Sequence, residues 1–300
     1  MTLFSESALR KLDQLALTAS QVRSGAIKGE RRSNKKGQSV EFADYRNYVQ
    51  GDDLRRLDWN LYARLEKPFI KLLEDEEDLA VHILLDCSAS MDWHADEKHP
   101  ADSHKFTYAR RLAGALAYLA LGAGDLLTFA ALRNGQVGEQ YGPARGRQHT
   151  LRLIRWLTAL PANASTDLTT ALKQYALRVS RPGLCIVLTD LFSPNGWQEG
   201  ITALQTRGHE CVLLQILAPE ELEPTLSGDL RLIDSESGIG QEVSLNDGLL
   251  HLYRKRVQQW QLETAEWCTK RAVHFVPINT ATPWDELLLT TLRKRGIVSG

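Results

Sequence analysis

The sequence predicts an α/β protein built on a doubly wound, mostly parallel β-sheet and preceded by an N-terminal extension. Short and almost continuous apolar runs recur along the chain, and segments with helical periodicity separate them. An apolar run of this kind fits a strand that is buried on both faces of a parallel sheet. Strands that alternate with helices indicate a parallel sheet covered by helices on both faces.

The first strand of the predicted sheet covers residues 79–85, an apolar run that ends at Asp86. The next strand, residues 126–132, is followed by Asn134-Gly135, a dipeptide that favours a tight hairpin turn. The segment after this turn is therefore expected to return as an antiparallel edge strand over residues 136–141. Further strands are expected at residues 184–189, 211–217 and 274–277, and a small two-stranded piece at 230–234 and 242–245.

The helices are predicted from apolar stripes and capping residues. Several leucines share one face of the segment 104–121, and Ser5 can cap an N-terminal helix over residues 5–20. Pro283 is a typical first residue of a helix. The remaining helices are expected at residues 150–160, 168–180, 197–205, 247–270 and 283–294.

The chain divides near residue 78 into an irregular N-terminal part and the alternating pattern. Its 300 residues amount to one large domain or two modest ones. We expect residues 1–77 to form an extension that packs on the main domain, residues 78–300.

Composition excludes several classes of protein. Hydrophobic residues make up 43% and charged residues 24%, and 36 basic against 37 acidic side chains give a formal net charge of −1. This balance excludes both a generally basic, nucleic-acid-binding surface and a chain too polar to collapse. No apolar run approaches the roughly 18 to 20 residues of a membrane helix, and Met1 starts no signal-peptide pattern. The protein is therefore expected in the cytoplasm, without membrane insertion.

Polar side chains gather where the predicted strands end. Asp86, Ser88 and Ser90 follow the first strand at a spacing that can aim all three at a common point. Thr166 lies in a later loop, and Asp190 stands at the tip of the strand 184–189. Ligands of doubly wound sheets bind at the carboxyl ends of the strands. An all-oxygen cluster suits a hard cation such as Mg²⁺, which could accept one more carboxylate from outside.

Each of these residues also has a purely structural interpretation. Asp86, Ser88 and Ser90 are residue types that cap helices and bond loop backbones. Thr166 is a possible N-cap of the following helix, and Asp167 takes that place if Thr166 turns toward a metal ion.

The spacing Asp86-x-Ser88-x-Ser90, together with Thr166 and Asp190, resembles the metal-ion-dependent adhesion site of von Willebrand factor type A domains. The predicted succession of strands and helices also matches that fold. The resemblance implies that Asp86, Ser88 and Ser90 form the first ligand loop. It further implies that Thr166 joins the shell directly or through water, and that Asp190 bonds through water.

A second resemblance lies upstream, in a long and distinctive run of motifs. This run is similar to the signature of a bacterial family of such domains, catalogued as domain of unknown function number 58. The similarity covers residues 28–200 well and the last third of the chain more loosely. The motifs are Gly37-Gln38-Ser39-Val40-Glu41-Phe42, Arg46-Asn47-Tyr48, Gly51-Asp52-Asp53-Leu54-Arg55, Leu57-Asp58-Trp59 and Ala63-Arg64.

The family resemblance implies a function. Genes of this family often neighbour a MoxR-type AAA+ ATPase, which implies a non-enzymatic adaptor or co-chaperone whose metal site grips an acidic side chain of a protein partner. The expected ion is Mg²⁺, with Mn²⁺ or Ca²⁺ as alternatives. Two other interpretations stay open: a metal ion that only cements the loops, and a metal-dependent phosphoesterase that uses Asp86 and Asp190.

Other enzyme classes fit the sequence poorly. An aspartyl-phosphate phosphatase needs a second aspartate two residues after the first, where this chain has Ser88. The chain has neither the G-x-S-x-G motif of serine hydrolases nor a phosphate-binding loop of the G-x-x-x-x-G-K-[ST] type.

A histidine-rich segment follows the first ligand loop. His94, His99 and His104 alternate with acids, but their spacing matches no standard metal motif. We interpret the segment as a polar loop that borders the metal site and shapes the choice of partner. The upstream acids and arginines could include catalytic carboxylates, but we interpret them as a buried ion-pair network that pins the extension against the sheet. They are Glu41, Arg46, Asp52, Asp53, Arg55, Asp58 and Arg64.

Overall fold

The chain forms two compact units. The computed structural model describes residues 4, 6–13, 15–18, 41–49, 57–74, 79–93, 104–226, 228–234 and 238–299. One unit comprises Met1–Ser24 and Leu79–Gly300, and the other comprises Gly25–Asp78. The first residues thus belong with the main unit, and the packing of the extension on the main domain stays a prediction.

A mixed, mostly parallel six-stranded sheet forms the centre of the main unit, as predicted. Its strand order is β11-β8-β7-β4-β5-β6, and only β6 runs antiparallel to its neighbour. The chain proceeds from β4 to one side of the sheet and then crosses to β7 on the other side, so β4 and β7 flank the switch point. The strands are β4 (Ala80–Asp86), β5 (Leu126–Arg133), β6 (Gln136–Ala144), β7 (Leu184–Thr189), β8 (Glu210–Leu217) and β11 (His274–Asn279).

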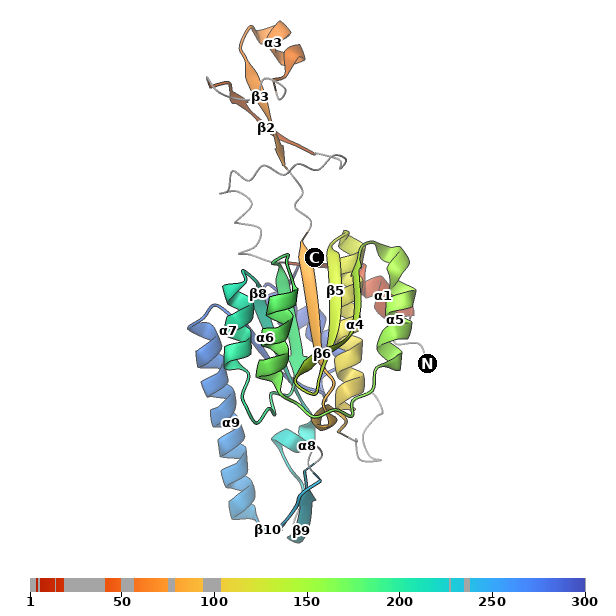
Figure 1. Ribbon diagram of the computed structural model, residues 1–300, viewed down its shortest axis with the longest axis vertical. Coiled ribbons are helices and arrows are strands. Elements are labelled where there is room, and N and C mark those ends of the chain that lie inside the picture. The colour runs from red at the N-terminus through yellow and green to blue at the C-terminus, as the bar shows by residue number, and fades with distance from the viewer. Residues whose placement is uncertain are drawn as a thin grey trace. The chain divides into compact units, whose positions relative to one another are not determined.

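Helices cover both faces of this sheet (Figure 1). Ile83 and Leu85 of β4 belong to a core that includes α4, whereas Leu84 belongs to a second core with α6 and α7. This alternation follows from the two-residue period of a strand. The helices are α4 (Lys105–Ala123), α5 (Thr150–Ala159), α6 (Leu168–Arg178), α7 (Gln198–Thr206), α8 (Pro219–Leu222), α9 (Asp247–Thr269) and α10 (Trp284–Leu287).

Two terminal elements differ from the sequence prediction. The N-terminal helix α1 (Glu6–Leu12) ends well before residue 20, and β1 (Ala16–Leu17) follows it. β1 pairs antiparallel with β12 (Val298–Ser299), and only 1% of Leu17 is exposed. Tertiary pairing thus overrides the leucine stripe from which a longer helix was predicted. The predicted helix 283–294 is α10 followed by a π-helical turn, η5 (Leu288–Leu292).

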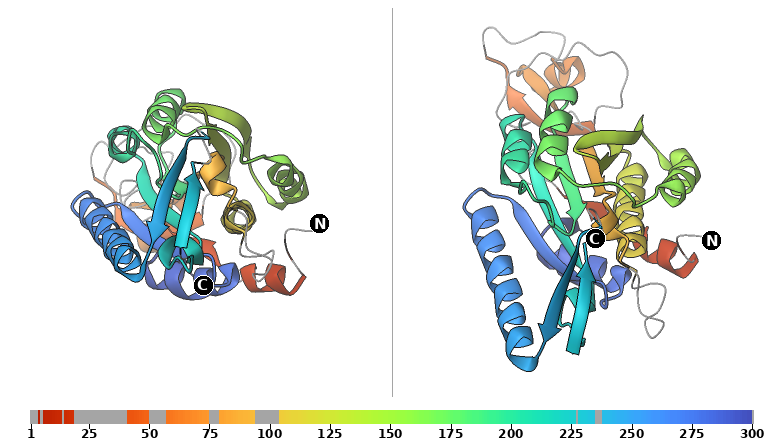
Figure 2. Two further views of the ribbon diagram at one scale, coloured as in Figure 1. Left: turned by 90° about the horizontal axis from the view of Figure 1, so that it is seen from below. Right: turned by 60° about the horizontal axis from the view of Figure 1, so that its bottom comes forward.

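A hairpin and a long helix extend the main unit beyond the sheet. The hairpin consists of β9 (Gly228–Ile233) and β10 (Gly240–Leu245), as predicted. Figure 1 shows α8 between the hairpin and the sheet, and Figure 2 shows the hairpin beside α9. No helix in the described ranges combines the length and apolar character needed to span a bilayer. All four cysteines are free and buried.

The upstream unit contains a small antiparallel sheet and one helix. β2 (Glu41–Asn47) pairs with β3 (Phe69–Glu74), and α3 (Trp59–Leu65) begins after Asp58. The Asp58 carboxylate caps α3, accepting hydrogen bonds from the backbone N–H groups of Asn60 and Leu61 at 3.0 and 3.1 Å. Asp52, Asp53 and Arg55 lie outside the described residues, so the predicted ion-pair network stays a prediction.

His82 is buried in β4, where a hydroxyl, a backbone carbonyl and a second imidazole ring surround it. Its Nδ1 lies 2.9 Å from the Tyr175 hydroxyl, its Nε2 lies 3.1 Å from the Arg181 carbonyl oxygen, and the His209 ring packs edge-on at 4.8 Å. Burial lowers the pKa of His82 to about 3, and the neighbouring His209 contributes to this shift. The folded protein therefore holds His82 neutral.

The free energy of unfolding should accordingly fall on acidification. Below about pH 6.5 the unfolded chain protonates His82 while the folded chain does not, until the pH approaches about 3. Within that window His82 should cost about 1.4 kcal/mol per pH unit. His82→Gln keeps the hydrogen-bonding capacity but removes the titration. Urea unfolding at several pH values should show a shallower acid slope for this variant, and an unchanged slope would contradict the assignment.

A candidate metal centre at the ends of β4 and β7

The two predicted carboxylates lie at the same edge of the sheet. Leu85 of β4 pairs with Leu188 of β7, so the two parallel strands end side by side. Asp86 is the last residue of β4, and Asp190 directly follows β7. Only 2% of Asp86 and 0% of Asp190 is exposed. This edge is the switch point of the doubly wound sheet, where ligands of such folds bind.

Hydrogen bonds fix the Asp86 carboxylate from two sides. One carboxylate oxygen accepts from the Ser88 backbone N–H at 3.0 Å, and the other accepts from the Thr189 hydroxyl at 2.7 Å. Thr189 in turn accepts from the Leu191 backbone N–H at 3.0 Å. Burial and the negative charge of Asp190 raise the pKa of Asp86 to about 6, although the bonds from Thr189 and Ser88 lower it. The structure thus holds the buried Asp86 carboxylate in a fixed position next to Asp190, which repels its negative charge.

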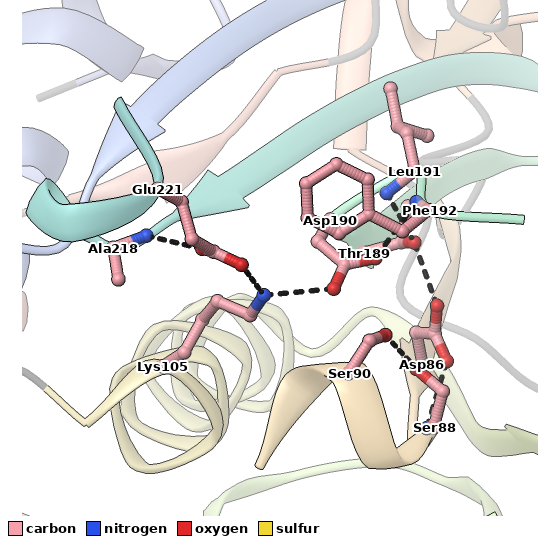
Figure 3. A network of polar contacts seen from close by, with 10 residues as sticks. All are labelled: Asp86, Ser88, Ser90, Lys105, Thr189, Asp190, Leu191, Phe192, Ala218 and Glu221. Carbon is pink, nitrogen blue, oxygen red and sulfur yellow. Dashed lines mark hydrogen bonds and ion pairs between the residues drawn. The ribbon is translucent and has the colours of Figure 1, made fainter. Parts of the chain in front are cut away.

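The two serines of the first loop point toward each other (Figure 3). Ser88 is fully buried, Ser90 lies in the short 3₁₀ turn η2 (Ala89–Met91), and their hydroxyl oxygens are 2.9 Å apart. Two neighbouring ligands of octahedral Mg²⁺ at 2.0–2.1 Å bond length are also about 2.9 Å apart. The hydroxyl pair therefore fits two adjacent positions around such an ion.

The loop that carries Thr166 lies against the first ligand loop. Ala164 forms a bridge with Ser88, and its carbonyl oxygen accepts from the Ala89 backbone N–H at 2.7 Å. Thr166 is half-buried two residues further on. Asp167, not Thr166, is the N-cap of α6, since its carboxylate accepts from the Thr170 backbone N–H at 3.0 Å. The capping interpretation of Thr166 is therefore wrong.

A buried lysine, Lys105, completes the cluster, although no sequence pattern indicates it. The Lys105 ammonium donates to Asp190 at 2.8 Å and to Glu221 at 2.7 Å (Figure 3). Asp190 also accepts from the Phe192 backbone N–H at 2.9 Å, and Glu221 from the Ala218 backbone N–H at 2.7 Å. A lysine in the first turn of an amphipathic helix is usually solvated, so only tertiary structure shows this contact.

Electrostatics in this cluster leave an excess of negative charge. Burial lowers the pKa of Lys105, but the charges of Asp190 and Glu221 raise it more, so the net direction is upward. With all three acids ionised, the carboxylates of Asp86, Asp190 and Glu221 and the ammonium of Lys105 give a formal charge of −2. Burial raises the pKa of Glu221 as well as that of Asp86, as expected for acids in excess. A divalent cation would neutralise this charge. The donor set and the charge both fit Mg²⁺ held by Asp86, Ser88 and Ser90.

The histidine-rich segment does not form a second metal centre within the described residues. His94 and His99 lie outside them, whereas the His104 ring caps α4 by accepting from the Thr107 backbone N–H at 3.3 Å. The His104 ring also lies 3.3 Å from the Asp92 carboxylate. No group of three or more histidine, cysteine, aspartate or glutamate side chains in the described ranges is placed to hold a metal ion. A centre at β4 and β7 would thus depend on hydroxyl ligands.

The chain belongs to the family described as "Protein of unknown function DUF58", whose profile matches residues 44–262. It is 28% identical over 299 residues to the uncharacterized proteins Mb1516 of Mycobacterium bovis and Rv1480 of Mycobacterium tuberculosis. Each alignment covers 98% of this chain and 91% of the relative. The family found from the upstream motifs is therefore confirmed.

Two solved structures from Bacteroides are also similar. One is the conserved hypothetical protein BatB from Bacteroides thetaiotaomicron, with a TM-score of 0.42 and 15% identity over 72% of this chain and 98% of that one. The other is an aerotolerance-related membrane protein from Bacteroides fragilis with multiple mutations to serines, with a TM-score of 0.42 and 14% identity over 72% and 99% of the two chains.

Thr189→Val tests whether the hydroxyl of Thr189 supports the Asp86 carboxylate. The variant keeps the shape of the side chain but leaves a buried carboxylate oxygen without its donor, which should cost about 1–3 kcal/mol of unfolding free energy. Thr206→Val is a matched control, since Thr206 is exposed and its hydroxyl bonds only a helix carbonyl. Chemical denaturation should separate the two variants, and equal losses would contradict the role of Thr189.

Proposed function

We propose that this protein is a non-enzymatic adaptor or co-chaperone that binds an acidic side chain of a protein partner through a divalent cation. Asp86, Ser88 and Ser90 would hold the ion, with Thr166 and Asp190 in or beside its shell. The observation that carries the proposal is the gathering of one carboxylate and two hydroxyls at the switch point of the sheet. The oxygens of the two hydroxyls, on Ser88 and Ser90, are 2.9 Å apart.

The ligand chemistry supports binding of an outside acid. A cation held by one carboxylate and neutral hydroxyls keeps much of its positive charge, and Mg²⁺ usually retains exchangeable water. A glutamate or aspartate of the partner can replace that water and form a charge-assisted contact. Asp190 is occupied by Lys105 and by the Phe192 backbone, which favours an indirect role for this carboxylate. Mn²⁺ and Ca²⁺ share the preference for oxygen ligands.

The environment of Cys87 argues against thiol catalysis next to the ligands. Cys87 is the strongest nucleophile by residue type next to the ligands, but burial and the charge of Asp86 raise the pKa of its thiol to about 12. A buried thiol of that pKa is not an effective nucleophile. This argues against a covalent step through a thiol at this site.

The identity of the partner is proposed from the family resemblance and from the surface near the ligand loops. A MoxR-type AAA+ ATPase is the proposed partner, and the cytoplasm is the proposed location of the complex. Trp93 and Phe192 are 42% and 41% exposed and follow the ligand loops of Ser90 and Asp190 by three and two residues. Exposed aromatic side chains are enriched in protein interfaces. They suit a partner acid that is flanked by apolar residues.

Mg²⁺ should stabilise the wild-type protein against unfolding. A ligand that binds only the folded state at about 100 times its dissociation constant adds about 2.7 kcal/mol. Asp86→Asn, which is nearly isosteric, should abolish the magnesium-dependent rise in melting temperature. Asp247→Asn is the matched control: Asp247 is an exposed acid in the first turn of α9, and its replacement should leave the magnesium response intact. An unchanged wild-type melting temperature would contradict the metal site.

Capture of the partner should depend on the metal. A purified MoxR-type ATPase should bind the wild-type protein with Mg²⁺, and both EDTA and Asp86→Asn should weaken that binding about tenfold or more, as expected for loss of a buried charge pair. Surface plasmon resonance measures the dissociation constants. Binding that survives both treatments would leave the metal with a structural role only, and turnover of a generic phosphoester lost in Asp190→Asn would favour the phosphoesterase.

A further inference from the structure

Among the charged residues that the structure describes outside the ligand loops, Lys105 is the most deeply buried. Its side chain is 0% exposed, and its ammonium lies between Asp190 at 2.8 Å and Glu221 at 2.7 Å. The ring of Phe192 lies 5.3 Å from the same ammonium. A lysine is almost never fully buried unless it is paired, and here two carboxylates from different strand ends pair with it.

The three charged residues come from separate parts of the chain. Lys105 starts α4, Asp190 follows β7, and Glu221 lies in α8 after β8. Glu221 is also tied to α9, because the Tyr253 hydroxyl donates to its carbonyl oxygen at 2.7 Å. The ammonium therefore has a fixed position, set by backbone elements on three sides.

We propose that Lys105 is a built-in cation of this site, which keeps the acid cluster folded without metal and weakens the binding of a divalent cation. This inference rests on the proposed function, since it concerns the affinity of the same site. Without Lys105 the cluster would carry a formal charge of −3 and leave Asp190 and Glu221 buried without their cation. Removal of one partner of a buried ion pair is strongly destabilising.

The positive charge of Lys105 also opposes the binding of a divalent cation at the ligand loops. Asp190 uses one carboxylate oxygen for Lys105 and the other for the Phe192 backbone, so little of its charge is free for an incoming ion. At the effective dielectric constant of a protein, a fixed positive charge a few ångströms away repels a divalent cation substantially. Lys105 thus holds the metal affinity in a range where the ion exchanges readily.

Two variants should change the affinity for Mg²⁺ in opposite directions. Lys105→Met removes the positive charge and should tighten Mg²⁺ binding by about tenfold or more. Glu221→Gln removes one negative charge, leaves the ammonium on Asp190, and should weaken binding by a similar factor. A purely structural role of the triplet would weaken binding in both variants. Lys105→Arg keeps the charge and is the control.

Isothermal titration calorimetry with MgCl₂ on the full chain measures these constants, and thermal unfolding in EDTA gives a second readout. Lys105→Met should melt lower than wild type in EDTA and regain more of its melting temperature on addition of Mg²⁺. If Lys105→Met is too unstable to purify, Lys105→Gln decides, because its amide can still donate hydrogen bonds to Asp190 and Glu221 but carries no charge. Tighter Mg²⁺ binding by Lys105→Gln supports the inference, and unchanged or weaker binding overturns it.

The outcomes separate this inference from the proposed function. If the wild type binds Mg²⁺ and both variants bind it equally well, the inference is overturned and the proposed function stands. If Lys105→Met alone binds Mg²⁺, Lys105 is the resident cation and the proposed function fails. If neither the wild type nor Lys105→Met binds Mg²⁺, the inference and the proposed function are both overturned.

Discussion

The burial of two carboxylates at the ends of neighbouring parallel strands is the constraint on which this site depends. The pairing of Leu85 with Leu188 brings Asp86 and Asp190 to the same edge, and both are removed from water. Like charges in a buried position repel, which is one reason why the pKa of Asp86 rises to about 6. Each element around the edge supplies a group that offsets this cost: a hydroxyl from Thr189, backbone N–H groups from the loops, and the ammonium of Lys105.

This arrangement costs stability. Hydrogen bonds and one lysine reduce the repulsion, but a formal charge of −2 remains beside two hydroxyl groups. A purely structural cluster of buried charges would be expected to balance its charge more closely. Functional sites are the places where proteins keep such local conflicts, and an incoming divalent cation would resolve this one.

Much of the fold follows from local sequence. The apolar runs at residues 79–85 and 184–189 and the Asn134-Gly135 turn predicted β4, β7 and the antiparallel edge strand β6, because burial on both faces and hairpin geometry are local signals. The short strand β1 was missed, since its only partner is β12 at the other end of the chain.

The candidate site likewise contains residues that the sequence reveals and residues that only the structure reveals. Asp86 and Asp190 could be found because acids directly after buried strands stand out in a sequence. Lys105 and Glu221 could not, because each resembles an ordinary solvated residue at a helix start and their contacts span 85 and 116 residues. A pattern of residue types predicts which groups reach an edge, whereas their charge balance depends on tertiary contacts.

The most direct test of the account is the location of bound metal in a crystal. Manganese scatters anomalously and shares the ligand preferences of magnesium. Crystals grown with MnCl₂ should show one strong anomalous peak, bounded by the carboxylate of Asp86 and the hydroxyls of Ser88 and Ser90, with Lys105 still on Asp190. A map without a peak at this position at saturating MnCl₂, and with the two serine hydroxyls still bonded to each other, would contradict it.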